Sequence, residues 1–249
     1  MEGAPLSPPF PEIEPPTTEV RFPNPRLVPQ DVIAVGTDFR PGTLLAAYRA
    51  GIFPWPQSGR RGKEIVAWFS PDPRALLPLD RIAWSRSLRR TLRNHPYEIT
   101  VDAAFRETMV ACGAERAGGT WISPQVVAGY TQLHELGWAH SVEVWARGDE
   151  TRELVGGIYG VAIGCSFAGE SMFHRRTDAS KIAFATLAEH LRDAGYALFD
   201  AQVMNPHLES LGCIDVARDV YLDRLARAIA DEPKNPIGAW PRVLRGRRD

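Results

Sequence analysis

One short segment in the C-terminal third of the chain carries two polar side chains at strand spacing. Asp200 and Gln202 flank one alanine in a run, from Ala197 to Val203, that predicts a β-strand. Residues i and i+2 of a strand point to the same face, so a carboxylate and a carboxamide are expected side by side. Transfer of an acyl group to an amine needs a group that receives or relays a proton and a polar donor for the carbonyl oxygen. This pair could supply both, although a hydrogen-bonded framework pair would use the same residue types.

Glu170 is a second acidic candidate. It follows Gly169 and leads into the apolar pair Met172 and Phe173. An acid set among apolar residues is either paired or functional, and this one could bind an ammonium group. The alternative is a surface glutamate at the end of a strand.

Two tryptophans, Trp55 and Trp121, lie in short segments rich in turn-forming residues. An exposed indole stacks on a nucleobase of any sequence, which is worth about 1–3 kcal/mol per base. Both could instead be core residues.

A predicted helix from Ser85 to Arg93 presents three arginines on one face. Arg86, Arg90 and Arg93 stand at positions i, i+4 and i+7. Such a ridge could contact phosphates, and no acidic residue lies between Arg81 and His95 to neutralise it. The alternative is an ordinary solvated helix face.

Other chemistries have little support in the sequence. The chain has no P-loop, dinucleotide-binding glycine motif, serine-hydrolase elbow or His-Glu-x-x-His motif. Its three cysteines form no disulfide or zinc pattern, and His134 and His140 lack helical metal spacing. A net charge of −1, no long apolar run and no secretory signal lead us to expect a cytoplasmic protein that holds any nucleic acid through a local patch.

Capping residues and apolar periodicity predict the elements that position these side chains. Residues 1–29 carry nine prolines and predict a disordered or extended arm. A small N-terminal unit is expected over residues 30–73, and a larger unit with helices and a mostly antiparallel sheet over residues 74–249. The expected helices lie between Pro41 and Gly51 and over 85–93, 102–112, 123–137, 180–194 and 220–230, with Asp102 as an N-cap. The expected strands are 141–145, 154–159, 162–168 and 197–203.

Nine ordered segments carry a family resemblance: Leu44–Trp55, Trp68–Arg74, Gly119–Ile122, Leu133–Trp145, Leu154–Val161, Gly169–Phe173, Ala179–Lys181, Asp200–Gln202 and Ser210–Gly212. In these segments the chain resembles the bacterial leucyl/phenylalanyl-tRNA–protein transferases, from about Val32 to Leu225. The resemblance implies an α+β fold, with a small N-terminal α/β domain on a GNAT-like acyltransferase domain. It implies a monomeric enzyme that moves Leu, Phe or Met from aminoacyl-tRNA to the N-terminal Arg or Lys of a protein. That transfer marks the acceptor for N-end rule degradation, without a cofactor, a metal or a membrane.

The resemblance also suggests roles for the candidate residues. Trp55 and Trp121 would hold the terminal adenosine of the tRNA, and the three arginines would contact the tRNA. Four apolar residues would line the side-chain pocket: Ile158, Phe167, Met172 and Phe199. Leu187 and Leu191 stand where a well-known member has phenylalanines. Our hypothesis is that Asp200 and Gln202 position and deprotonate the acceptor amine, while Glu170 holds a cationic group of donor or acceptor.

Two alternatives come from other functional classes. An acetyl-CoA-dependent acyltransferase could use the same fold, although the chain lacks the Arg/Gln-x-x-Gly-x-Gly/Ala turn that usually holds pyrophosphate. A non-catalytic RNA-binding module could use the arginine ridge and the tryptophans.

Overall fold

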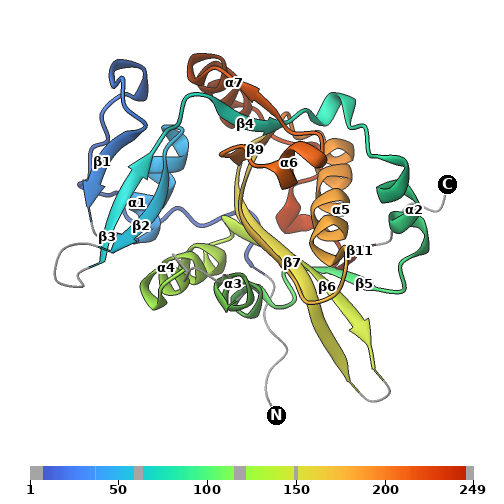
Figure 1. Ribbon diagram of the computed structural model, residues 1–249. Coiled ribbons are helices and arrows are strands. Elements are labelled where there is room, and N and C mark those ends of the chain that lie inside the picture. Colours follow the sequence, from blue (N-terminus) through green and yellow to red (C-terminus); the bar gives the residue numbers. More distant parts are fainter. Residues whose placement is uncertain (1–7, 37, 59–63, 115–121, 149–150, 245–249) are drawn as a thin grey trace, which may run out of the picture.

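Two β-sheets and their covering helices form the α+β fold of the chain (Figure 1). The computed structural model describes residues 8–36, 38–58, 64–114, 122–148 and 151–244. The small sheet has the order β1-β3-β2, and all of its neighbours pair antiparallel. Its strands are β1 (Val32–Gly36), β2 (Phe53–Ser58) and β3 (Glu64–Phe69).

The large sheet has eight strands in the order β10-β4-β9-β8-β7-β6-β5-β11. In chain order they are β4 (Arg74–Leu77), β5 (Glu98–Val101), β6 (Ala139–Arg147), β7 (Arg152–Ile163), β8 (Ser166–His174), β9 (Leu198–Gln202), β10 (Ile214–Val216) and β11 (Val243–Leu244). β8 and β9 pair in parallel, while the other neighbouring strands pair antiparallel. The expectation of a mostly antiparallel sheet is therefore corrected to a mixed sheet. The parallel pair arises because a helix, α5 (Ala179–Ala194), connects β8 to β9, as parallel neighbours require.

Helices cover both faces of the large sheet (Figure 1). They are α1 (Pro41–Arg49), α2 (Arg86–Asn94), α3 (Phe105–Ala114), α4 (Pro124–Glu135), α5 (Ala179–Ala194), α6 (Pro206–Ser210) and α7 (Arg218–Ala230), with short 3-10 turns η1 (Pro25–Leu27), η3 (Leu79–Arg81) and η4 (Ile237–Ala239). On one face, α5 packs on β6, β7 and β8, and α2 packs on α5. On the other face, α3 packs on the same three strands, α4 packs on β6 and on α3, and α1 packs on α4 and α7. None of the described helices is long and apolar enough to cross a lipid bilayer.

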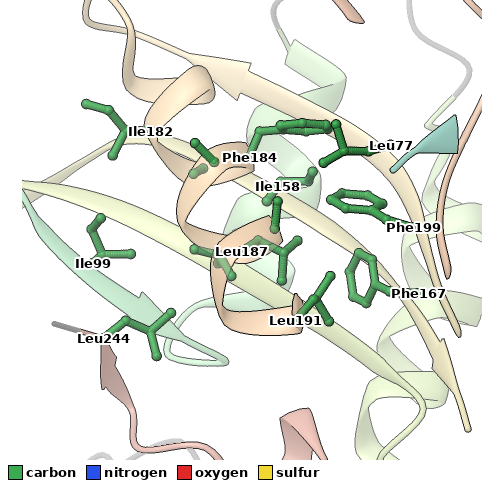
Figure 2. Close-up of a cluster of buried hydrophobic side chains, with 14 of the residues drawn as sticks. Leu77, Ile99, Ile158, Phe167, Ile182, Phe184, Leu187, Leu191, Phe199 and Leu244 are labelled. Atoms are coloured by element: carbon green, nitrogen blue, oxygen red, sulfur yellow. The ribbon is translucent and has the colours of Figure 1, made fainter. Parts of the chain in front are cut away.

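The core under α5 contains a cluster of aromatic side chains (Figure 2). Phe199 of β9 lies between Phe184 of α5, with ring centroids 5.0 Å apart, and Phe167 of β8, at 5.5 Å. Leu187 and Leu191 complete this cluster and are almost fully buried. Rings packed in this way hold the strands and the helix in a fixed relation.

Most of the predicted helices are confirmed, because their ends carry strong local signals. Ser123 caps α4 by accepting a hydrogen bond from the amide of Val126, and Gly195 ends α5 with a φ of 88°. The strand predicted over 162–168 was wrong, since those residues form the end of β7, a turn and the start of β8. Asp102 was also wrongly predicted as an N-cap. Its carboxylate instead accepts from the amide of Ser141 and pairs with His140.

The described part of the proline-rich arm, residues 8–29, is extended and bound to the rest of the chain. Ile13 exchanges hydrogen bonds with Leu136 and Trp138 after α4, and Glu14 pairs with Arg49 of α1. Farther along, Arg26 pairs with Asp219 and Asp223 of α7. The arm therefore joins α1, the end of α4 and α7.

Arg218 is a buried anchor of this arm. Its guanidinium donates to the carbonyl oxygens of Pro25, Val28 and Gln30, at 2.6–3.4 Å. We expect Arg218→Met to lower the melting temperature by several degrees, because each hydrogen bond to a charged group is worth about 1.5–3 kcal/mol. Differential scanning calorimetry measures this shift. The control is Arg227→Met on the exposed side of the same helix, and an equal shift in both variants would contradict the anchoring role.

Candidate functional site

The site forms where the parallel strands β8 and β9 separate. Their pairing ends at Ala168 and Asp200, and each strand then carries a bulge. The register of β8 against β7 skips Glu170, and the register of β9 against β4 skips Ala201. Bulges bend a strand and redirect its side chains, and they are frequent beside active sites. The sheet is thus open at the residues that the sequence singled out.

A cavity of about 370 Å³ occupies this opening. Its apolar wall comes from four elements: Ile158 of β7, Met172 of β8, Phe184 of α5 and Phe199 of β9. Trp55 of β2 also lines it, with its side chain partly exposed. A volume of this order, with an apolar wall and a few polar groups, is typical of a small-molecule site.

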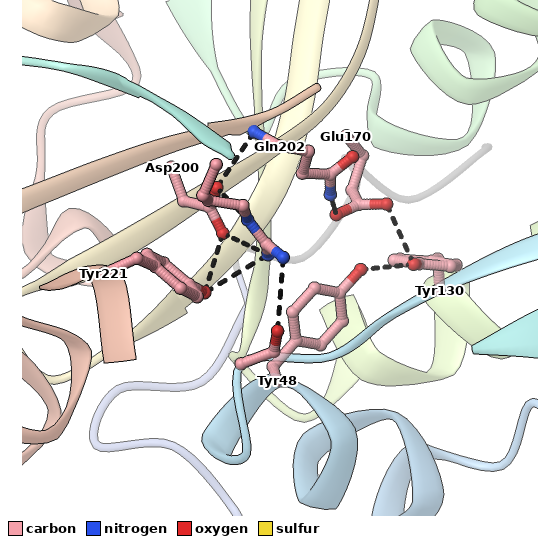
Figure 3. A network of polar contacts seen from close by, with 8 residues as sticks. Tyr48, Tyr130, Glu170, Asp200, Gln202 and Tyr221 are labelled. Atoms are coloured by element: carbon pink, nitrogen blue, oxygen red, sulfur yellow. Dashed lines mark hydrogen bonds and ion pairs between the residues drawn. The ribbon is translucent and has the colours of Figure 1, made fainter. Parts of the chain in front are cut away.

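The polar end of the cavity is a chain of hydrogen bonds (Figure 3). The carboxamide Nε2 of Gln202 donates to Oε1 of Glu170 at 2.6 Å. The Tyr130 hydroxyl donates to Oε2 of Glu170 at 3.1 Å and also bonds the Tyr48 hydroxyl at 2.5 Å. Both oxygens of Glu170 are therefore held in place, by groups from β9 and α4.

Burial raises the pKa of Glu170 to about 7. The hydroxyls of Tyr48 and Tyr130 lower this pKa, but they only partly offset the cost of placing a charge in an apolar surrounding. The nearby Asp200 carboxylate adds to the increase. Glu170 thus changes charge in the range where a general base or a cation-binding group is useful.

Asp200 lies behind the cavity and does not line it. Its side chain is 2% exposed and forms a two-pronged ion pair with Arg74, whose Nε and Nη2 donate at 2.8 and 2.7 Å. The hydroxyl of Tyr221 donates to the same carboxylate at 2.9 Å. Burial alone would lower the pKa of Arg74, but Asp200 and Tyr221 raise it above its ordinary value, so the guanidinium keeps its charge.

Comparisons with known proteins cover most of the chain, including most strands of both sheets. The model of the leucyl/phenylalanyl-tRNA protein transferase family matches residues 76–226, and the model of that family's N-terminal domain matches residues 37–72. The leucyl/phenylalanyl-tRNA–protein transferase of Shewanella baltica strain OS185 is 46% identical over 86% of this chain and 89% of its own length. That of Proteus mirabilis strain HI4320 is 48% identical over 84% of this chain and 88% of its own length. The chain belongs to the leucyl/phenylalanyl-tRNA–protein transferase family.

Among solved structures, L-PGS from Bacillus licheniformis is similar at a TM-score of 0.40 and 12% identity, over 64% of this chain and 65% of that chain. A likeness this low says nothing about function.

The structure of this transferase-family chain brings most of the predicted site residues together. Six of them line the cavity: Trp55, Ile158, Glu170, Met172, Phe199 and Gln202. Phe167 does not, because its ring is buried against Phe199. Leu187 and Leu191 are also buried in the core and do not line the cavity, which has Phe184 as its helix-borne aromatic wall. Trp121 lies outside the described residues.

Several important residues were not identified from the sequence. Tyr48 and Tyr130 hold Glu170, and Arg74 and Tyr221 hold Asp200. Tyr48, Tyr130 and Arg74 lie at least 40 residues along the chain from the carboxylates that they contact. The helical spacing of Tyr48 and Tyr130 marks them only as core residues. One signal was available for Arg74, since an arginine at the start of an apolar strand must be paired if it is buried.

The predicted arginine ridge lies on α2, on the far side of α5 from the small sheet (Figure 1). Arg86, Arg90 and Arg93 are exposed, and none of them pairs with a carboxylate among the described residues. Arg93 also borders a cleft between α2 and α5, together with Arg89 and Arg192.

His140 and the three cysteines lie outside the cavity. His140 is buried with Nδ1 2.8 Å from the Asp102 carboxylate, and the three cysteines are buried. Within the described residues, no group of three or more His, Cys, Asp and Glu side chains could hold a metal ion.

The raised pKa of Glu170 predicts a pH dependence of stability. In the unfolded chain this group loses its proton near 4.5, whereas in the folded protein it keeps the proton up to about 7. Between these values the folded state binds more protons, so the free energy of unfolding falls as the pH rises. Glu170→Gln should reduce the dependence of the free energy of unfolding on pH between about 4.5 and 7.

Urea unfolding from pH 4.5 to 8 measures this effect. Burial also raises the pKa of Glu143 to about 7, but this group titrates in both proteins, so the difference between wild type and variant isolates Glu170. A constant difference across this range would show that Glu170 titrates normally.

Proposed function

We propose that this protein transfers Leu, Phe or Met from an aminoacyl-tRNA to the N-terminal Arg or Lys of an acceptor protein. In this reaction the neutral amine of the acceptor attacks the ester carbonyl carbon of the aminoacyl group. An amide C–N bond forms, the ester C–O bond breaks, and the ribose hydroxyl of the tRNA leaves with the proton that the amine loses. The family's part in N-end rule degradation, as a tag on the acceptor, would follow from this reaction.

The observation that carries this proposal is the two-sided cavity. The apolar wall of Ile158, Met172, Phe184 and Phe199 suits an uncharged aliphatic or aromatic side chain. The polar end at Glu170 and Gln202 suits an amine and a carbonyl group. Because an aminoacyl ester is already activated, correct placement of its carbonyl next to an amine supplies much of the rate. The proposal therefore needs no cofactor.

We assign the catalytic roles to the polar end of the cavity. Glu170 would hold a cationic amine or take its proton, since its carboxylate titrates near neutral pH. Gln202 would orient the reacting groups, with Asp200 behind it as part of the same unit. At the rim, the partly exposed Trp55 would stack on the terminal adenosine of the tRNA, and Trp121 is proposed to do the same.

The exposed arginines of α2 support tRNA as the donor. A protein with a net charge of −1 needs a local basic surface to bind a polyanion, and Arg86, Arg90 and Arg93 form one. We propose that this ridge contacts the tRNA backbone while its aminoacyl end enters the cavity.

We further propose three units in the chain: the arm at 1–29, a small N-terminal domain at 30–73 and a GNAT-like catalytic domain at 74–249. The separate matches of the two family models to 37–72 and 76–226 support this division, as does the boundary between the two sheets. We also propose that the protein acts as a monomer in the cytoplasm.

A transfer assay tests the proposed function. Incubation with tRNA that carries radiolabelled leucine should label a peptide that begins with Arg and leave a peptide that begins with Ala unlabelled. The matched control is Gln202→Ala, which should lower the rate of labelling without loss of the folded state. If the protein bound the charged tRNA but labelled neither peptide, it would instead be an RNA-binding module. Stabilisation by coenzyme A in a thermal shift assay would indicate an acetyl-CoA-dependent acyltransferase.

Charge reversal tests the ridge. Arg86→Glu with Arg90→Glu should weaken tRNA binding and reduce the slope of log Kd against log salt by about one for each phosphate that the variant no longer binds. Filter binding at several salt concentrations measures both effects. The same reversal at Arg224 and Arg227, two exposed arginines of α7, is the control. Equal effects in the two double variants would argue against a specific interaction at α2.

A further inference from the structure

Gln202 adopts a backbone conformation that is unfavourable for its residue type. It is not a glycine, yet its φ is 66°, in the left-handed region. A residue in this region costs on the order of 1–3 kcal/mol and persists only where its surroundings fix it. Such strain clusters at functional sites, and here the strained residue is the one whose carboxamide reaches Glu170 at the cavity.

Asp200 is the group that fixes this conformation. The backbone N–H of Gln202 donates to Oδ1 of Asp200 at 2.9 Å, across the bulge at Ala201. This bond closes a short loop between the two residues. It leaves the side chain of Gln202 directed to Oε1 of Glu170 (Figure 3).

The carboxylate of Asp200 has no capacity left for a substrate. Its Oδ1 accepts from Arg74 Nε and from Gln202 N, and its Oδ2 accepts from Arg74 Nη2 and the Tyr221 hydroxyl. A carboxylate offers about four lone-pair sites, so all of them are taken. The side chain is also almost fully buried and does not line the cavity.

Arg74 in turn is held from three directions. Its Nη1 donates to the carbonyl of Gly51 at 3.2 Å, and its guanidinium lies 4.3 Å from the ring centre of Tyr221 and 4.7 Å from that of Phe53. Gly51 has a φ of 75°, in the left-handed region that favours glycine, and a Cβ there would stand 2.4 Å from Cδ2 of Leu222.

We infer that Arg74, Asp200 and Tyr221 are positioning residues that act on the reaction only through Gln202. They hold its left-handed backbone, so that its carboxamide stands between Glu170 and the substrate. The proton of the acceptor amine then goes to a group other than Asp200. This role rests on the proposed function, since it is defined by the transfer reaction.

The test compares the effect of Tyr221→Phe on kcat in the presence and in the absence of the Gln202 side chain. This variant removes only a hydroxyl and keeps the ring beside Arg74, so it should fold. In the wild-type background it should lower kcat by tenfold or more, up to roughly the 100-fold that misplacement of a reacting group can cost. In a Gln202→Ala background it should have no further effect, because the group that it positions is absent. Single-turnover transfer from leucyl-tRNA to an Arg peptide gives these rates.

A matched control separates positioning from general stability. Tyr196→Phe removes another buried tyrosine hydroxyl, which accepts from the amide of Ile237, and it should lower stability without changing kcat. As a second measurement, Asp200→Asn should keep a pH inflection at a reduced kcat, moved to lower pH because the Asp200 carboxylate no longer raises the pKa of Glu170. Glu170→Gln should lose the inflection.

The outcomes separate the two proposals. Equal effects of Tyr221→Phe with and without Gln202 would overturn the positioning role and leave the transfer function standing. Loss of the pH inflection in Asp200→Asn would overturn it too, since Asp200 would then exchange the proton. A wild-type protein that transfers no label would overturn the proposed function and this role together.

Discussion

The buried ion pair between Arg74 and Asp200 is the interaction on which the geometry of the site depends. Two charges that are 1% and 2% exposed stand in a surrounding that disfavours either charge alone. Removal of one partner from such a pair costs about 3–5 kcal/mol, because the other is left uncompensated. The pair can exist only if β4, β9, α7 and the Gly51 corner all meet at one point. Correct assembly of these four elements is therefore coupled to the shape of the cavity.

A continuous polar path extends from this pair to the first helix. It passes from Tyr221 through Asp200 and Gln202 to Glu170, and then through Tyr130 to Tyr48 (Figure 3). On the other side of the cavity the wall is apolar and is braced by the stacked rings of Phe184 and Phe199. The site thus combines a network that fixes hydrogen-bond directions with a packed wall that fixes size. The two halves come from opposite faces of the same sheet.

Local sequence signals predicted the helices, and the family resemblance indicated several residues of the cavity, but neither showed what holds them. Ser123 and Gly195 mark helix ends by themselves, so α4 and α5 could be predicted. Asp200 and Gln202 were found as a pair, but spacing gave no sign that one lies behind the cavity and the other lines it. That difference depends on a bulge and on Arg74, which is 126 residues away from Asp200. Contacts at such separations are set by tertiary packing, which periodicity does not encode.

The docked arm has a consequence for how the chain reaches its final structure. Residues 8–29 are synthesised first, yet Arg26 binds Asp219 and Asp223, and Arg218 closes over Pro25 and Val28. During synthesis, which proceeds at about 5–20 residues per second, the arm must wait roughly ten seconds or longer for α7 to emerge. Until then its proline content keeps it from competing as a strand for the open sheet edges of the nascent chain. The contacts between the arm and α7 would therefore be among the last native contacts to form.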